Sequence, residues 1–141
     1  MFENPSDARI LEILTKPRRV AVVGCSPDPN RDSHRIAKLL LDRGHRIFPV
    51  NPRGGQILGR PVARSLTSLT EPIDVVDVFR RPQALPEVVT DSITIGAKIL
   101  WLQLGVVDDA EAIRATAAGL TVVMDRCPAI EYRRLFSSRQ P

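Results

Sequence analysis

The sequence has few of the residues that several common kinds of site require. Only two of its 141 residues are cysteines, and they form no C-x-x-C pair, which argues against a disulfide scaffold. With only two histidines available as imidazole ligands, we expect no metal site. Aromatic residues make up 4% of the chain, too few to stack the bases of a nucleic acid, so no nucleic-acid partner is expected.

Long apolar runs are also missing. No segment approaches the roughly 20 residues that cross a bilayer, and the first residues lack the basic end and apolar middle of a signal peptide. We therefore expect a cytoplasmic protein with no membrane partner. In that compartment the thiols of Cys25 and Cys127 are expected to be reduced, which leaves open whether either has a redox role.

The chain is weakly basic, with a net charge of +4 and its arginines spread along the sequence. A spread of this kind suits a small anionic molecule better than a polyanion, which is bound by a concentrated basic patch. The length and the 43% hydrophobic content suffice for one core of ordinary size. We expect a single domain over residues 1–136 and a flexible tail over residues 137–141.

Strand-like and helix-like segments alternate along the chain. Apolar runs predict strands over residues 18–24, 46–50, 73–79, 97–102 and 120–124. Helical spacing predicts a helix from a cap at Ser6 to Thr15 and further helices over residues 33–43, 82–95, 108–118 and 128–136. The predicted fold class is α/β: a single doubly wound, Rossmann-like domain with a five-stranded, mostly parallel sheet and helices on both faces.

Two segments refine this prediction. Pro49 lacks the N–H that a central strand needs, so the strand at residues 46–50 should lie at an edge of the sheet. Residues 51–72 are predicted to form a loop with a short extended piece and one helical turn near residues 65–69, because three glycines and three prolines interrupt the pattern.

Sheets of this class bind ligands beyond the carboxyl ends of their strands, so the residues there are the candidate site. They are mostly small, polar or basic: Gly24, Cys25, Ser26, Pro27, Arg31 and Ser33 at the first strand; Val50, Asn51, Pro52 and Arg53 at the second; Phe79, Arg80 and Arg81 at the third; Gln103, Leu104 and Gly105 at the fourth; Cys127 and Pro128 at the fifth.

The first of these turns suits a phosphate. Gly24 lets the backbone turn sharply and approach a ligand, and Ser26 and Ser33 supply hydroxyl groups. Arg31 adds a planar fork beside a helix N-terminus, which favours negative charge. A capped helix with a solvated arginine would explain each residue alone, but their concentration on one edge favours binding.

The turn differs from the usual nucleotide loops. A G-x-G-x-x-G turn is absent, and Asn51 stands where an acid would hold the ribose of NAD. NAD is therefore disfavoured, whereas Arg31, Arg53, Arg80 or Arg81 could bind an additional ribose phosphate. The sequence also contains no P-loop.

No catalytic constellation is apparent. Asp74 and Asp77 are three apart on a strand and so face opposite sides, which argues against an acid/base pair. His34 and His45 stand in no arrangement with a nucleophile, and we expect them to be structural or solvated. Trp101, Phe79 and Cys127 are most simply packing residues.

Taken together, the motifs resemble those of the small stand-alone CoA-binding domain proteins. The motifs are Gly24-x-Ser26-x-x-Pro29-x-Arg31-x-Ser33, Val50-Asn51-Pro52, Val75-Val76-Asp77-Val78-Phe79-Arg80, Trp101-Leu102-Gln103-Leu104-Gly105 and Val123-Met124-Asp125-Arg126-Cys127-Pro128. The resemblance covers about residues 6–136. Proteins of this family have a Rossmann-like fold similar to the N-terminal domain of the succinyl-CoA synthetase α subunit.

The resemblance implies that the candidate residues bind coenzyme A or an acyl-CoA, with no catalysis by the chain itself. Asp32 departs from the family, which often has proline there, and it could cap the helix or repel phosphate. Two alternatives stay open: an NAD(P)-binding oxidoreductase or redox sensor, and the CoA-binding subunit of an acyl-CoA ligase. The acyl group, and whether the chain forms a homodimer or has a protein partner, also stay open.

Overall fold

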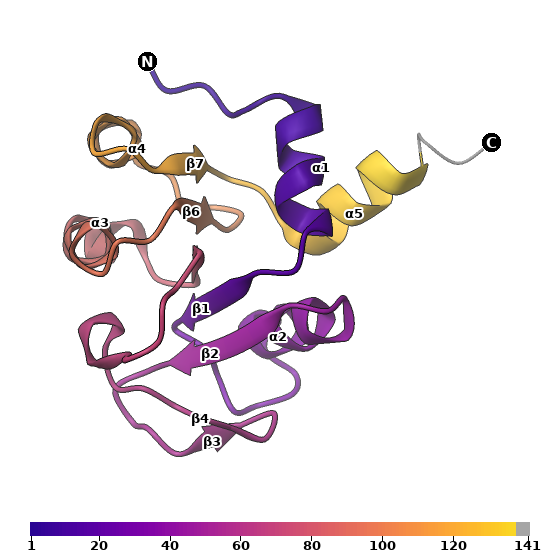
Figure 1. Ribbon diagram of the computed structural model, residues 1–141, viewed down its shortest axis with the longest axis vertical. Helices are drawn as coiled ribbons and strands as arrows, with labels where there is room; N and C mark the ends of the chain where they lie inside the picture. Colours follow the sequence, from indigo (N-terminus) through magenta and orange to yellow (C-terminus); the bar gives the residue numbers. More distant parts are fainter. Residues whose placement is uncertain (138–141) are drawn as a thin grey trace.

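The computed structural model, described here for residues 1–137, has one parallel five-stranded sheet (Figure 1). Its order is β2-β1-β5-β6-β7. The strands are β1 (Arg19–Val23), β2 (Arg46–Val50), β5 (Val75–Val78), β6 (Ile99–Leu102) and β7 (Thr121–Val123). The helices are α1 (Asp7–Thr15), α2 (Asp32–Asp42), α3 (Leu85–Thr94), α4 (Asp109–Ala117) and α5 (Pro128–Ser137). The predicted fold class is confirmed, and residues 138–141 of the predicted tail lie outside the described residues.

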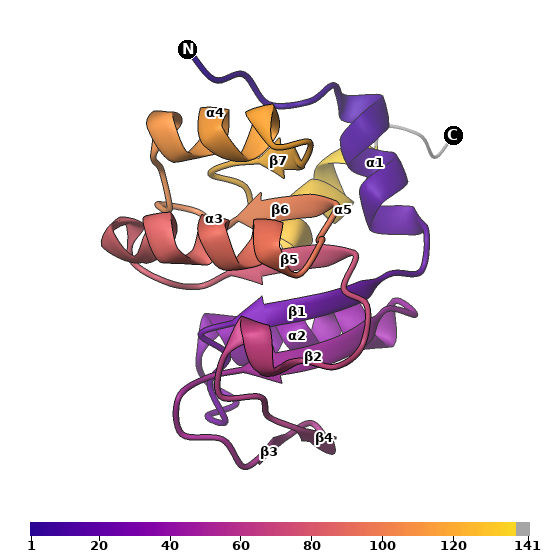
Figure 2. The ribbon, with the colours of Figure 1, turned by 60° about the vertical axis from the view of Figure 1, so that its left-hand side comes forward.

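Helices cover both faces of the sheet (Figure 2). On one face α3 and α4 pack over a core that includes Val76, Leu100 and Val122. On the other face α1, α2 and α5 pack over a second core, built around Val22 and Trp101. Because both faces are buried, the strands are almost continuously apolar, as a parallel sheet requires.

The β2 strand lies at one edge of the sheet, as Pro49 predicted. The loop that follows it contains a small hairpin of β3 (Gln56–Ile57) and β4 (Arg60–Pro61) and one 3-10 turn, η1 (Leu66–Ser68). An isolated parallel bridge joins Val50 to Ala63 and brings the end of this loop back to the carboxyl edge. The extended piece and helical turn expected in this loop are both present.

The predicted helix over residues 82–95 is divided. A 3-10 turn, η2 (Pro82–Ala84), precedes α3, and the Leu85 amide donates to the Pro82 carbonyl. Pro86 has no N–H with which to make the α-helical bond to that carbonyl, so the first turn closes one residue earlier.

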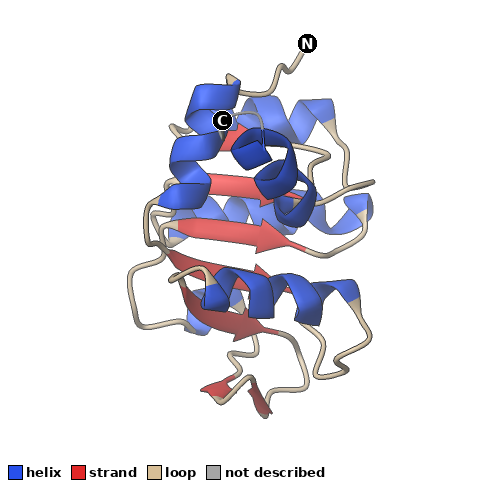
Figure 3. Ribbon diagram, turned by 90° about the vertical axis from the view of Figure 1, so that its right-hand side faces the viewer, coloured by secondary structure: helices blue, strands red, loops and turns tan. Residues whose placement is uncertain are grey.

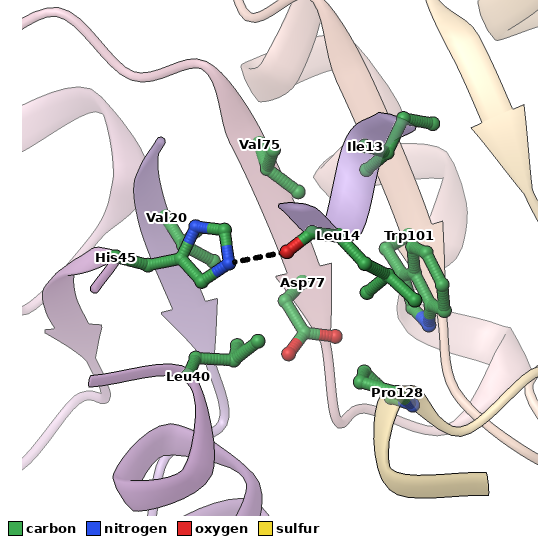
Figure 4. Close-up of a pocket in the computed structure, with 9 residues that line it drawn as sticks. All are labelled: Ile13, Leu14, Val20, Leu40, His45, Val75, Asp77, Trp101 and Pro128. Atoms are coloured by element: carbon green, nitrogen blue, oxygen red, sulfur yellow. Dashed lines mark hydrogen bonds between the residues drawn. The ribbon is translucent and has the colours of Figure 1, made fainter. Parts of the chain in front are cut away.

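His45 connects three elements beneath the second core (Figure 4). Its Nδ1 accepts from the Arg18 amide (3.1 Å), so Nε2 carries the proton and donates to the Leu14 carbonyl (3.0 Å). The Tyr132 hydroxyl donates to the same carbonyl (2.7 Å). Burial lowers the pKa of His45, with the Arg18 charge acting in the same direction. The predicted structural role of His45 is confirmed.

Asp77 is the most deeply buried acid among residues 1–137, with 1% of its surface exposed. Gln103 Nε2 donates to its Oδ1, while Oδ2 has no hydrogen-bond partner within the described part of the chain. Asp77 also lines a cavity of about 20 Å³, space for one water molecule, together with His45 and Trp101 (Figure 4). Burial raises the pKa of Asp77 to about 7, although the bond from Gln103 opposes this shift.

The Cys25 side chain belongs to the same core, with 1% of its surface exposed. Burial raises the pKa of its thiol to about 11, and the nearby Asp77 charge adds to the effect. Cys127 is half-buried at the start of α5 and carries a free thiol. The two cysteines therefore differ in exposure, and Cys25 stays a protonated thiol near neutral pH.

The first prediction concerns the pH dependence of stability. The pKa of Asp77 is raised in the folded chain, so folding favours its protonated carboxyl. The contribution of this proton to stability is fully present below about pH 4 and is lost as the pH rises through about 7. The variant Asp77→Asn lacks this loss. From pH 5 to pH 8 its free energy of unfolding, measured with urea, should rise by about 2–3 kcal/mol relative to that of the native chain.

The control for this experiment is Asp109→Asn, at an exposed acid in the first turn of α4. The free energy of unfolding of this variant should depend on pH as that of the native chain does. His45 is present in all three proteins, so its contribution cancels in the comparison. Parallel pH profiles for Asp77→Asn and the native chain would contradict the assignment.

The second prediction concerns thiol reactivity. Iodoacetamide attacks thiolates, so at pH 8 Cys127 should be alkylated at least about tenfold faster than Cys25 in the folded protein. Peptide mass spectrometry after timed quenching measures both rates, and unfolding in urea should equalise them. Equal rates in the folded chain would show that Cys25 is not held in the core.

Candidate functional site

The carboxyl ends of the five sheet strands lie along one edge of the molecule, where the arrowheads of the sheet point in Figure 3. The chain leaves β1 for α2 on one face of the sheet and leaves β5 for α3 on the other. Neighbouring strands whose connections diverge in this way form the crevice in which such sheets bind ligands. The crevice lies between the turn at Gly24 and the residues Phe79 and Arg80.

Gly24 closes the base of this crevice. Its φ of +81° is in the left-handed region, and a Cβ at this position would lie 2.4 Å from the Phe79 carbonyl oxygen. The absent side chain therefore makes room for the end of β5. The sequence predicts that the missing Cβ lets the backbone turn sharply and approach a ligand, and the structure adds that the turn lies against the protein's own backbone.

The turn after Gly24 is shaped by its own side chains. Ser33 Oγ accepts from the Ser26 amide (2.9 Å), and Ser26 Oγ accepts from the Asp28 amide (3.1 Å). Ser33 is buried, whereas Pro27 is exposed at the edge. The two predicted serines are thus brought together, with their oxygens used to hold the turn.

The N-terminus of α2 has no side-chain cap. Arg31 occupies the N-cap position with extended backbone (φ −87°, ψ 146°) and makes no capping hydrogen bond. By contrast, Ser6 caps α1 and Asp108 caps α4. Of the two roles considered for Asp32, capping is wrong, since its exposed carboxylate pairs with Arg35. The first-turn amides of α2 therefore lack a side-chain acceptor, which suits an anion.

Four exposed arginines follow the carboxyl ends of three neighbouring strands, β2, β1 and β5. Within residues 1–137 none of them takes part in an ion pair, including the pairs with Asp77 or Glu87 that the sequence left open. They are Arg31, Arg53, Arg80 and Arg81. Unpaired guanidinium groups grouped at an edge are suited to phosphate.

Asn51 organises the loop after β2. Its Nδ2 donates to the Cys25 carbonyl (2.9 Å), while its Oδ1 accepts from the amides of Arg53 (2.8 Å) and Gly54 (3.0 Å). The Asn51 carboxamide is therefore used within the protein, and the Cys25 backbone, but not its buried thiol, lies at the edge. Both residues shape the site through loop structure.

A hollow of about 160 Å³ opens on the α3 side of the crevice. It is lined by the predicted residues Gly24, Val50, Asn51, Pro52 and Arg80, and by Val23, Arg64, Ser65, Leu66, Glu87, Val88 and Asp91. Burial raises the pKa of Asp91, and the Glu87 charge adds to this shift. An open hollow of about 640 Å³ adjoins it along Phe79, Arg80 and Arg81.

Sequence reasoning missed Arg64, Glu87 and Asp91. Arg64 reaches the edge through the Val50–Ala63 bridge, and its guanidinium donates to the Pro52 carbonyl (3.1 Å). Glu87 and Asp91 lie on α3, four residues apart, and so share a helix face. None of these three residues directly follows a strand of the main sheet, so a prediction from strand ends alone omits them. The four-residue spacing of the two acids does indicate that they share a helix face.

On the other side of the crevice the strand ends are more apolar. Leu104 is 56% exposed, and the Gly105 amide donates to Asp125 Oδ1 (2.9 Å). Gln103 is buried with its amide on Asp77, and Cys127 is half-buried. Pro128 is also buried, and it lines the internal cavity and not the carboxyl edge (Figure 4).

Two further findings concern metal sites and membrane-spanning helices in the described residues. Residues 1–137 contain no group of three or more His, Cys, Asp or Glu side chains placed to hold a metal ion. No helix in this part of the chain has the length and apolarity to span a membrane.

Several known proteins are similar to this chain in sequence or structure. The chain is 42% identical over 131 residues to the uncharacterized protein YneT of Bacillus subtilis, covering 93% of this chain and 97% of that protein. A hypothetical protein from Pyrococcus horikoshii has a similar structure, with a TM-score of 0.87, 37% identity and coverage of 96% and 99% of the two chains.

A longer relative is the α subunit of an ADP-forming acetate–CoA ligase from Pyrococcus furiosus. It is 31% identical over 96 residues, which are 64% of this chain but only 21% of that subunit. The family described as CoA binding domain matches residues 18–133, a range that includes every strand and the helices from α2 to the first part of α5. The chain therefore belongs to the CoA-binding domain family.

Proposed function

We propose that this protein binds coenzyme A or an acyl-CoA along the carboxyl edge of its sheet and performs no catalysis of its own. The uncapped N-terminus of α2, with unpaired arginines around it, carries the proposal. A cation at an N-cap is unfavourable beside the positive end of the helix dipole. A bound phosphate would reverse that cost and satisfy the free amides.

The two sides of the crevice suit different parts of the coenzyme. Arg31 and the first-turn amides of α2 would hold the diphosphate. In the hollow beside α3, the carboxylates of Glu87 and Asp91 can accept hydrogen bonds from the free ribose hydroxyl or the adenine amino group. Arg80 lines the same hollow and is free to pair with the ribose phosphate that distinguishes coenzyme A from NAD.

An NAD(P)-dependent activity has less support. The residue at the end of β2 is Asn51 and not an acid that could bind a ribose diol, and its carboxamide is engaged with Cys25 and Arg53. The ligase alternative rests on the Pyrococcus furiosus subunit, of which this chain covers about a fifth. If the chain worked as a ligase component, the catalytic groups would come from a partner, and co-purification of that partner would show it. A free-standing binder of a cytoplasmic metabolite needs no partner.

The third prediction separates binding from folding at Arg31. Arg31→Ser places a good capping side chain where the backbone is already extended, which should stabilise the protein by about 1 kcal/mol. Its Tm should therefore rise by roughly 3 °C. Loss of the guanidinium should weaken coenzyme A binding, measured by calorimetry, by about 10- to 100-fold.

Lys98→Ala is the charge-matched control, because Lys98 is exposed and directly precedes β6, at the opposite edge of the sheet. It should bind coenzyme A like the native chain at the same salt concentration. If Arg31→Ser kept full affinity, α2 would not be the phosphate site.

The fourth prediction tests the ribose phosphate at Arg80. Native protein should bind dephospho-coenzyme A about tenfold or more weakly than coenzyme A, the size expected for one charge-assisted pair. Arg80→Ala should bind the two molecules equally and should bind dephospho-coenzyme A like the native chain. A tenfold preference retained in the variant would exclude Arg80 as the partner.

A further inference from the structure

A third hollow lies on the face of the sheet opposite α3, between α2 and α5. It encloses about 520 Å³. Its walls are mostly apolar side chains: Ile36, Leu39, Phe79, Leu104, Ala129 and Ile130. We call it the α2–α5 groove.

The groove exposes large hydrophobic side chains. Leu104 is 56% exposed and Ile130 is 41% exposed, and both stand in its wall. Apolar side chains gathered around a hollow, unlike single ones scattered on a surface, mark a binding surface. A volume of this size is also within the usual range for small-molecule sites, about 300–1,000 Å³.

The groove continues from the proposed coenzyme site. Phe79 lines both this groove and the open hollow beside Arg80. Gln103, Leu104 and Cys127 follow β6 and β7 at the same edge and also line the groove. A flexible arm that begins at the arginines and passes Phe79 would therefore enter the α2–α5 groove.

The charged residues at the rim of the groove do not favour a charged ligand. Asp32 and Arg35 pair with each other, and the Gln103 amide is held by Asp77. Arg133 is exposed on α5 and is the remaining charged residue of the lining. Most of the interior offers only hydrocarbon, so an uncharged apolar group fits it best.

We propose that the α2–α5 groove receives the acyl group of a CoA thioester, and that this group is an uncharged hydrocarbon chain longer than acetyl. The inference rests on the proposed function, since the thioester arrives as part of the bound coenzyme. No bond is made or broken in this step. The groove would set which acyl-CoA the protein prefers.

Calorimetry with acetyl-, butyryl-, hexanoyl- and octanoyl-CoA tests the proposal. Each added methylene that enters the groove should tighten binding by about fourfold, until the groove is filled. Equal affinities across the series, with coenzyme A itself still bound, would overturn this inference and leave the proposed function standing. Failure to bind any of the molecules would overturn both.

A variant pair places the effect in the groove. Ile130→Gln on α5 should flatten the dependence on chain length, with the largest loss of affinity for octanoyl-CoA. Ile113→Gln on α4 is the matched control, because Ile113 is 46% exposed and lies on a helix of the other face. Since both side chains are exposed, both variants should fold. A chain-length dependence left intact in Ile130→Gln would overturn the inference.

Cys127 provides a separate readout from within the groove. At saturating ligand, octanoyl-CoA should slow its alkylation by iodoacetamide more than acetyl-CoA does; neither molecule carries a competing thiol. Equal protection by the two would place the acyl group elsewhere. Alkylation that slowed with rising protein concentration alone would show a second copy of the chain in the groove, and this result would also overturn the inference.

Discussion

The close contact between Gly24 and the Phe79 carbonyl is the constraint on which the rest of the site depends. A Cβ at Gly24 would stand 2.4 Å from that oxygen, and the φ of +81° is one that glycine adopts without cost. The contact holds the turn after β1 directly against the end of β5. Those two strands are also the pair whose connections diverge to opposite faces. One backbone contact thus sets the base of the crevice, with the α3 hollow on one side and the α2–α5 groove on the other.

At the same edge, several residues are not the ones that would stabilise the local structure best. An arginine occupies an N-cap, where serine, threonine, asparagine or aspartate would stabilise the helix. Four arginines at the same edge have no ion-pair partner within residues 1–137. The starts of α1 and α4 follow the rule, with Ser6 and Asp108 as caps, whereas α3 continues from a 3-10 turn with Ala84 at its N-cap. Departures from local rules that gather at one edge are the mark of a functional surface.

Local signals in the sequence were sufficient for most of the fold. Pro49 identified the edge strand, and Ser6 marked the first helix, because the features that decide them lie within a few residues. The sequence could not show which side chains meet across the sheet. That Gln103 donates to Asp77, that Pro128 turns inward and that Arg64 returns through the Ala63 bridge all depend on long-range packing. Glu87 and Asp91 were missed for a different reason, since they reach the site from a helix face and not from a strand end.

The central claim is that coenzyme A binds at the carboxyl edge with its diphosphate on the first turn of α2. Backbone amide NMR during a titration with coenzyme A tests it most directly. The account predicts that the amide signals of Asp32, Ser33 and His34 shift most, together with those around Gly24 and Arg80. The signals of residues at the opposite edge, such as Lys98, should stay in place. Large shifts confined to that opposite edge, or none at saturating coenzyme A, would contradict the account.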